Sequence, residues 1–132
     1  MLTNRRIAAA LAVPTIALSV LAAAPAVASG GGDANRNSGS CSSSTSWKIK
    51  AKADDARIEV EAEIDSNKTG QTWTWKLKDN GNVVATGRST TQGASGSFSL
   101  GRKPGDRAGT DHFVFRAVHA GSGEVCRATV AW

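Results

Sequence analysis

The sequence predicts a small all-β protein, an antiparallel β-sandwich of immunoglobulin-like type with about seven strands and one disulfide bond. Three observations lead to this prediction. After residue 46, apolar and polar residues alternate with a period of two, turn-forming residues separate the alternating segments, and no helical period is present. Two cysteines lie toward the two ends of this region. A small closed β-barrel fits the same pattern and is the alternative fold.

The first 28 residues have the features of a secretory signal peptide. Arg5 and Arg6 precede an apolar run from residue 7 to 24, and the small-residue site Ala26-Val27-Ala28 follows it. An arginine pair also occurs in twin-arginine signals, but the residues around this pair favour the general secretory route. We therefore expect cleavage after Ala28 and a secreted, extracellular protein without a membrane span after processing.

The segment between the predicted cleavage site and the first strand differs in composition from the rest. Residues 29–46 are rich in Gly, Ser and Asn and carry no apolar period, which predicts a flexible leader. This leader contains Cys41, and the second cysteine is Cys126. In an oxidising compartment such a pair predicts one structural disulfide. Residues 47–132 then form the β-sandwich domain.

Residues 47–54 and 57–64 predict a hairpin whose register follows from the sequence. With a two-residue turn at Asp55-Ala56, every lysine of the first strand lies opposite a glutamate of the second, and apolar residues meet on the other face. The charged pairs are Lys48 with Glu63, Lys50 with Glu61 and Lys52 with Glu59. This basic run is therefore neutralised rather than available to a polyanion. The expected turn type needs a positive φ at Ala56, so we expect Ala56→Gly to stabilise the domain.

Five further strands follow, separated by turn signals. They are expected at residues 72–78, 83–89, 95–100, 111–119 and 124–132. The Asn80-Gly81 pair predicts a two-residue hairpin turn that places Trp75 opposite Thr86. The last two strands are expected to pair with Ala117 opposite Cys126, which builds part of the core.

Several segments of the chain, taken together, resemble a group of uncharacterised small secreted actinobacterial proteins. The segments are SGSCSSSTSWKIKAKADDARIEVEAEID, KDNGNVVATG, GASGSFSL, AGTD and SGEVC, and the two that contain cysteine are the most specific. The likeness spans nearly all of the chain after the signal peptide. In similar sequences the first turn tends to read Asp-Gly, so Asp55-Ala56 departs from the pattern. The resemblance implies secretion and an actinobacterial host, and it implies no mechanism.

Residues suited to catalysis or metal binding are scarce. His112 and His119, the two histidines, are seven positions apart on one predicted strand, so their side chains point to opposite faces. With both cysteines in a disulfide, no transition-metal site is expected, and a hairpin turn accounts for Asp54-Asp55 without calcium. No Gly-x-Ser-x-Gly motif is present, and the adjacent Asp111 and His112 point apart. We therefore expect a protein that is not an enzyme and has no cofactor and no metal.

The overall charge gives little support for nucleic-acid binding. The chain has 16 basic and 11 acidic residues, and two of the basic ones, Arg5 and Arg6, leave with the signal peptide. Because only a mild positive excess remains, no nucleic-acid partner is expected.

Two sets of residues are candidates for ligand binding. The first is tryptophan, which stacks on sugar rings when exposed, and here Trp73 and Trp132 are the candidates. The second is the irregular loop 101–110, in which Arg102, Lys103 and Arg107 could meet an anionic polymer. A buried position in the core is the ordinary alternative for the tryptophans, and a solvated loop is the ordinary alternative for the cations.

From these features we expect a monomeric, secreted, non-catalytic protein that works as a binding module or a cell-surface accessory module. The expected partner is a cell-wall polymer, a polysaccharide or a secreted protein. The Ser- and Thr-rich run 89–99 adds a predicted sheet edge that a partner strand could join. A secreted inhibitor is the alternative function, and its rigid loop would be the segment around Pro104.

Overall fold

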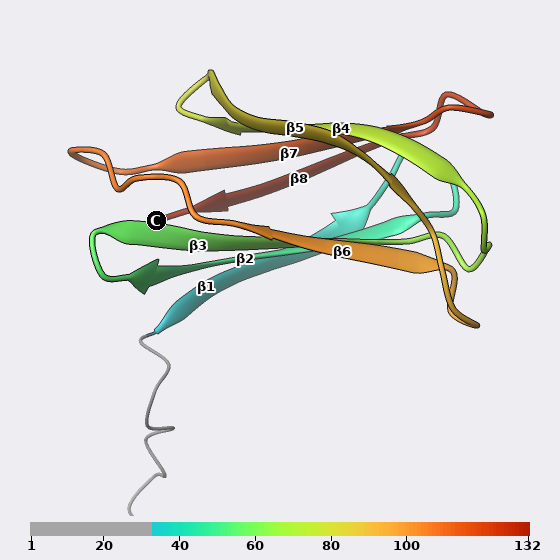
Figure 1. The fold of residues 1–132 in the computed structure, drawn as a ribbon, viewed down its shortest axis with the longest axis horizontal. Coiled ribbons are helices and arrows are strands. Elements are labelled where there is room, and N and C mark those ends of the chain that lie inside the picture. Colours follow the sequence, from blue (N-terminus) through green and yellow to red (C-terminus); the bar gives the residue numbers. More distant parts are fainter. Residues whose placement is uncertain (1–32) are drawn as a thin grey trace, which may run out of the picture.

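The computed structural model describes residues 33–132, so the predicted signal peptide lies outside the described residues. Eight strands and no helix are present in this part of the chain. The strands are β1 (Ala34–Ser40), β2 (Ser46–Asp54), β3 (Arg57–Asp65), β4 (Thr72–Asp79), β5 (Asn82–Thr90), β6 (Ser97–Arg102), β7 (His112–His119) and β8 (Val125–Ala131). They form two antiparallel sheets with the orders β1-β2-β3-β6 and β5-β4-β7-β8. Figure 1 shows the two sheets as two stacked layers.

The predicted β-sandwich is confirmed, and the closed barrel is excluded because the strands form two separate sheets. The strand order departs from that of an immunoglobulin domain, in which the third strand crosses to the opposite sheet. Here β3 stays beside β2, and β4 is the first strand of the second sheet. The chain returns to the first sheet once, at β6, before β7 and β8 complete the second sheet.

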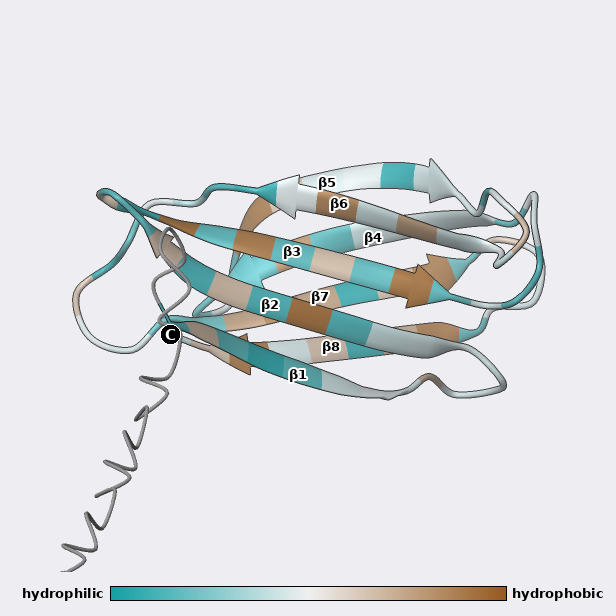
Figure 2. Cartoon of the chain, turned by 90° about the horizontal axis from the view of Figure 1, so that it is seen from below, coloured by the Kyte–Doolittle hydropathy of each residue, from teal (hydrophilic) through white to brown (hydrophobic). Residues whose placement is uncertain are grey.

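The additional strand is β1, which lies in the segment predicted as a flexible leader. It pairs with β2 along its whole length, with Gly39 opposite Trp47. None of its residues is fully buried, and Figure 2 shows its largely hydrophilic colouring beside the alternating bands of β2 and β3. The prediction of a flexible leader was therefore wrong for residues 34–40. This edge strand is held by backbone hydrogen bonds, which need no apolar period.

Side-chain hydrogen bonds and a disulfide connect the β1 region to β8 in the opposite sheet. The side-chain amides of Asn35 and Asn37 donate to backbone carbonyl oxygens of β8, at 2.8 and 2.9 Å. The predicted disulfide between Cys41 and Cys126 is present and links residues 85 positions apart in the chain. The chain-entropy description gives a stabilisation of about 4 kcal/mol for a loop of this length. These contacts connect the two sheets along the side of the sandwich where β1 and β8 lie.

Glu124 holds the turn between β1 and β2 from the opposite sheet. Its carboxylate accepts hydrogen bonds from the backbone amides of Ser43 and Thr45, at 2.9 and 3.1 Å, and from the Thr45 hydroxyl at 2.7 Å. Burial alone would raise the pKa of Glu124, but these hydrogen bonds and the nearby His119 lower it below its ordinary value of 4.5. The ionised carboxylate therefore stabilises the folded state.

The predicted registers of two hairpins are confirmed. β2 and β3 pair with Lys52 opposite Glu59, as the matched charges require. β7 and β8 pair with Ala117 opposite Cys126. In both hairpins the alternation of the sequence admits one pairing that keeps apolar side chains on a common face.

The turn between β2 and β3 differs from the expectation in its backbone. The positive φ lies at Asp55, at 54°, and Ala56 has no positive φ. The expected positive φ at Ala56 was therefore wrong, and the reason to expect a gain from Ala56→Gly is removed, because glycine has no strained backbone to relieve at that position.

The hairpin of β4 and β5 keeps the predicted Asn80-Gly81 turn but contains a bulge next to Lys78. The bulge shifts the register by one residue, so that Gly87 lies opposite Trp75 in place of the predicted Thr86. The Trp75 indole occupies the space beside this glycine, since a Cβ on Gly87 would lie 2.5 Å from Trp75 Cζ2. The bulge thus places Gly87, which has no side chain, beside the large ring of Trp75.

The core lies between the sheets and consists of the inward-facing rows of β2, β3, β4, β7 and β8, with Phe98 added from β6. Trp47, Trp73 and Trp75 are the largest side chains in it. Two inward positions, at the end of β4 and just before β7, hold the buried aspartates Asp79 and Asp111. The core is therefore apolar along its length and acidic at one end.

Gly87→Ala is expected to lower the free energy of unfolding by about 1–3 kcal/mol, because the new methyl group must displace the buried Trp75 ring. Urea denaturation measures the change. Gly101→Ala is the matched control, since a Cβ there meets only Glu61 Cγ, at 3.9 Å. Equal losses in the two variants would contradict the close packing of Gly87 against Trp75.

Glu124→Gln is expected to lower the free energy of unfolding by about 1–3 kcal/mol near neutral pH, because a neutral amide accepts weaker hydrogen bonds. The folded-state pKa of Glu124 is lowered, so its stabilisation is present above about pH 4.5 and is lost as pH falls through the folded-state pKa. Thermal unfolding near neutral pH and at about pH 3 should show the difference shrinking in acid. Glu63→Gln, on the outer face of β3, is the control, and a pH-independent difference for Glu124→Gln would argue against the assigned role.

Candidate functional site

The tryptophans do not form an exposed stacking platform. Trp73 is fully buried, and its ring stacks on His119 with a centroid distance of 5.2 Å. Trp132 is partly buried and packs against the core. Trp73 therefore cannot be the predicted sugar platform, and Trp132 presents only part of its ring to solvent.

Two of the three predicted loop cations are engaged by neighbouring strands. Lys103 Nζ lies 2.8 Å from Asp54 Oδ2, and this hydrogen-bonded ion pair lowers the pKa of Asp54. The guanidinium carbon of Arg102 lies 5.1 Å from the centroid of the Trp75 ring, a cation–π contact. Both side chains line a hollow of about 410 Å³ with Arg107. Each of these two charges therefore has a partner within the protein, and the Lys103 side chain is 59% exposed.

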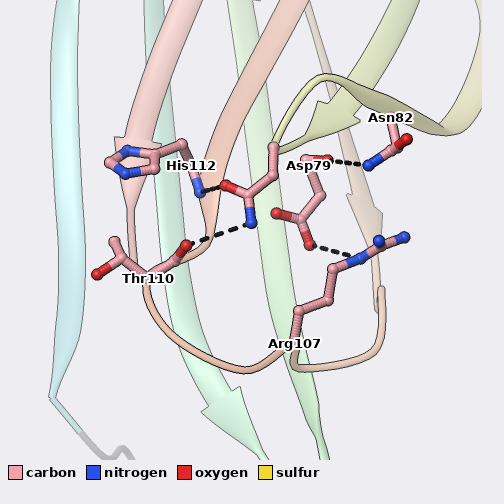
Figure 3. A network of polar contacts seen from close by, with 6 residues as sticks. Asp79, Asn82, Arg107, Thr110 and His112 are labelled. Carbon is pink, nitrogen blue, oxygen red and sulfur yellow. Dashed lines mark hydrogen bonds and ion pairs between the residues drawn. The ribbon is translucent and has the colours of Figure 1, made fainter.

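The third loop cation, Arg107, closes one end of the sandwich. Its Nε lies 3.6 Å from Oδ2 of the fully buried Asp79, and Figure 3 shows this contact between the loop and the end of β4. The Asn80 side chain joins the same region, because it donates to the Thr110 carbonyl oxygen and accepts from the His112 backbone amide. The predicted basic loop is therefore anchored to the core by its own cations.

The outer face of the β2–β3 hairpin is electrically matched, as predicted. Lys50 Nζ lies 2.9 Å from Glu61 Oε2, and Lys52 Nζ lies 3.6 Å from Glu59 Oε2. The remaining lysine of β2 lies opposite the remaining glutamate of β3. Arg36 of β1 adds one further positive charge to this face.

The outer face of the opposite sheet has a different charge pattern. Its outward positions carry five exposed cations, which we call the cationic face, and no Asp or Glu. The cations are Lys76 and Lys78 of β4, Arg88 of β5, Arg116 of β7 and Arg127 of β8. None of them forms an ion pair within residues 33–132. The positive excess of the described chain is therefore concentrated on one sheet.

Three cations of this face form a row across neighbouring strands. The register places Lys76 opposite Arg116, and Arg116 opposite Arg127. Opposed residues in antiparallel strands have Cβ atoms about 4.5–5.5 Å apart, and like charges at that separation destabilise a sheet. The row lines a shallow hollow of about 600 Å³ together with Val114 and Val118. This arrangement is unfavourable by itself and becomes favourable when an anion lies on it.

The sequence contains the signal for this face, although the predicted cationic site was the loop 101–110. Lys76 and Lys78 alternate with buried residues of β4, and the register that pairs Ala117 with Cys126 also pairs Arg116 with Arg127. The mild net charge hides the face, because acidic residues elsewhere in the chain offset its five cations in the total.

Comparisons with protein-family models, with curated proteins and with solved structures find no match. None of the described residues belongs to a helix long and apolar enough to cross a membrane. No group of three or more His, Cys, Asp or Glu side chains in residues 33–132 is arranged to hold a metal ion by itself. The surface chemistry of the chain is therefore the basis for a functional proposal.

Arg127→Glu is expected to raise the free energy of unfolding by up to about 1 kcal/mol, because it turns a like-charge pair with Arg116 into an opposite-charge pair. Urea denaturation at low ionic strength measures the gain, which should shrink as salt is added. Lys48→Glu is the control on the matched face, and it should lower stability by placing a glutamate opposite Glu63. A loss of stability in Arg127→Glu would contradict the unfavourable row.

Proposed function

We propose that this protein is a secreted, non-catalytic binding module whose cationic face takes an anionic polymer of the cell surface. The observation that supports this most directly is the row of Lys76, Arg116 and Arg127, which opposes like charges without an acidic neighbour. Proteins depart from local rules of stability mainly at functional sites, where a ligand supplies the missing interaction. The row is such a departure, on an outer face where solvent and polymers have access.

The shape of the face favours a linear ligand over a compact small molecule. Adjacent strands lie about 4.8 Å apart, so the row across β4, β7 and β8 spans roughly 10 Å. Arg88 on β5 and Lys78 on β4 extend the positive charge beyond it. A chain with repeated anionic groups can contact several of these cations at once, whereas a single small anion contacts only a few.

The side chains suit phosphate or carboxylate groups. Arginine binds such groups with two parallel hydrogen bonds, and lysine binds them as a compact charge. A cell-wall polymer that carries one phosphate in each repeat, such as a teichoic acid, has this chemistry. The predicted signal peptide and the resemblance to secreted actinobacterial proteins would bring the module to such a polymer.

The other functions considered from the sequence have less support. Sugar stacking lacks an exposed platform, because Trp73 is buried and Trp132 is partly buried. An inhibitor needs a projecting rigid loop, but the loop around Pro104 is bound to β3, where the Ile58 backbone amide donates to the Pro104 carbonyl oxygen at 3.0 Å.

Cosedimentation with bacterial cell walls tests the proposal. The purified, oxidised protein is expected to pellet with walls that retain teichoic acid, and less with walls from which acid extraction has removed it. Binding should weaken as salt rises, because the contacts are ionic. The double variant Arg116→Gln, Arg127→Gln should bind about tenfold more weakly or worse, since two charged hydrogen-bond donors are lost.

The matched control is Lys48→Gln, Lys50→Gln, which removes two cations from the opposite face and should retain binding. Equal weakening of the two double variants would mean that net charge alone drives pelleting, against a specific face. Pelleting that resists salt would contradict an ionic site, and no pelleting on any wall would overturn the proposal and direct the search to a protein partner.

A further inference from the structure

Two fully buried aspartates lie beside each other at one end of the core, beneath the loop that follows β6. Asp79 ends β4, Asp111 immediately precedes β7, and each has an exposed fraction of 0%. None of their four carboxylate oxygens accepts a hydrogen bond from the described residues. A pair of buried carboxylates without donors is unfavourable unless a cation or a proton accompanies it.

A third carboxylate reaches this pair from the loop. Asp106 is exposed and lies next to Asp111. The loop is tied to β3, because the Ile58 backbone amide donates to the Pro104 carbonyl oxygen and the Asp106 backbone amide donates to the Ala56 carbonyl oxygen. The loop backbone therefore holds the exposed Asp106 over the end of the core.

Arg107 compensates the negative charge of Asp79, Asp111 and Asp106 only in part. Arg107 Nε lies 3.6 Å from Asp79 Oδ2, which is longer than a hydrogen bond, and 51% of the Arg107 side chain is exposed. The Arg107 backbone amide approaches the Asp111 carboxylate without completing a hydrogen bond. When all three carboxyl groups are ionised, one guanidinium leaves two negative charges, which a single divalent cation would balance.

We propose that Asp79 and Asp111, joined by Asp106 from the loop, form a calcium-binding site at this end of the sandwich. All the side-chain ligands are carboxylate oxygens, which Ca²⁺ and Mg²⁺ prefer, and no His or Cys belongs to the group. Ca²⁺ accepts six to eight oxygens in flexible geometry and completes its shell with backbone carbonyls and water, whereas Mg²⁺ demands a near-ideal octahedron. Two rigid buried carboxylates beside an irregular loop fit the more flexible ion.

The site differs from the sequence expectation of no metal and is independent of the cationic face. The two buried carboxylates form its fixed part. Because no three acidic side chains surround one point in the structure, binding requires Asp106 and the exposed Arg107 side chain to adjust with the loop. The other candidate for calcium in the sequence was Asp54-Asp55. There Asp54 forms an ion pair with Lys103, and Asp55 belongs to the hairpin turn.

Thermal unfolding of the purified, oxidised protein with EDTA, with Ca²⁺ and with Mg²⁺ tests the site. Calcium sites of extracellular modules have Kd values on the order of 0.1–1 mM. Ca²⁺ at about 10 mM should therefore raise Tm by about 5–15 °C over the EDTA value, and Mg²⁺ should raise it much less. Isothermal titration calorimetry should give one Ca²⁺ per chain.

Asp111→Asn should remain folded in EDTA, because the amide has the size of the carboxyl and removes a buried charge, and it should lose the rise in Tm with Ca²⁺. Asp106→Asn, on the exposed loop, should weaken Ca²⁺ binding several-fold without disturbing the core. Asp55→Asn is the matched control and should keep the full rise, since asparagine tolerates the positive φ of that turn. A wild-type Tm that ignores Ca²⁺, or an equal rise in Asp111→Asn, would overturn the site and leave a shared proton as what holds the aspartates together.

Discussion

The structure depends on β4, which contributes side chains to the core and to both candidate sites. It can do so because successive side chains of a strand point to opposite faces of the sheet. Its inward row places Trp73 and Trp75 in the core and ends at Asp79, which belongs to the proposed calcium site. Its outward row places Lys76 and Lys78 on the cationic face. A slip of one residue would bury the lysines and expose the tryptophans, so neither site can change its position without the other.

The two sheets use the same cross-strand contacts to opposite effect. On one outer face each lysine of β2 meets a glutamate of β3, and the charges stabilise the sheet weakly. On the other face the same geometry sets lysine against arginine and arginine against arginine. At one end of the core the neighbouring like charges are negative, because the buried carboxyl groups of Asp79 and Asp111 lie together. The stabilising charge pairs and the two proposed binding sites thus lie on different parts of one small domain.

Local alternation made the sandwich and two registers predictable, because only one pairing of β2 with β3, or of β7 with β8, keeps apolar residues together. β1 was not predictable, since an edge strand that buries none of its side chains has the composition of a linker. The bulge near Lys78 depends on the fit of Gly87 beneath Trp75, which a turn motif does not encode. The candidate sites were harder still. The loop cations look free in the sequence, and only the tertiary fold brings a ring or a carboxylate to each.

The position of the disulfide has a consequence for how separate molecules meet. β1 depends on backbone pairing, on the amides of Asn35 and Asn37, and on the bond at Cys41 just beyond its end. If β1 detached, β2 would become an open edge with Trp47 uncovered beneath it. The matching strand of a second molecule could then occupy that edge, which is the route to domain swapping. By keeping β1 near its own sheet, the covalent bond favours the closed monomer over exchange between copies.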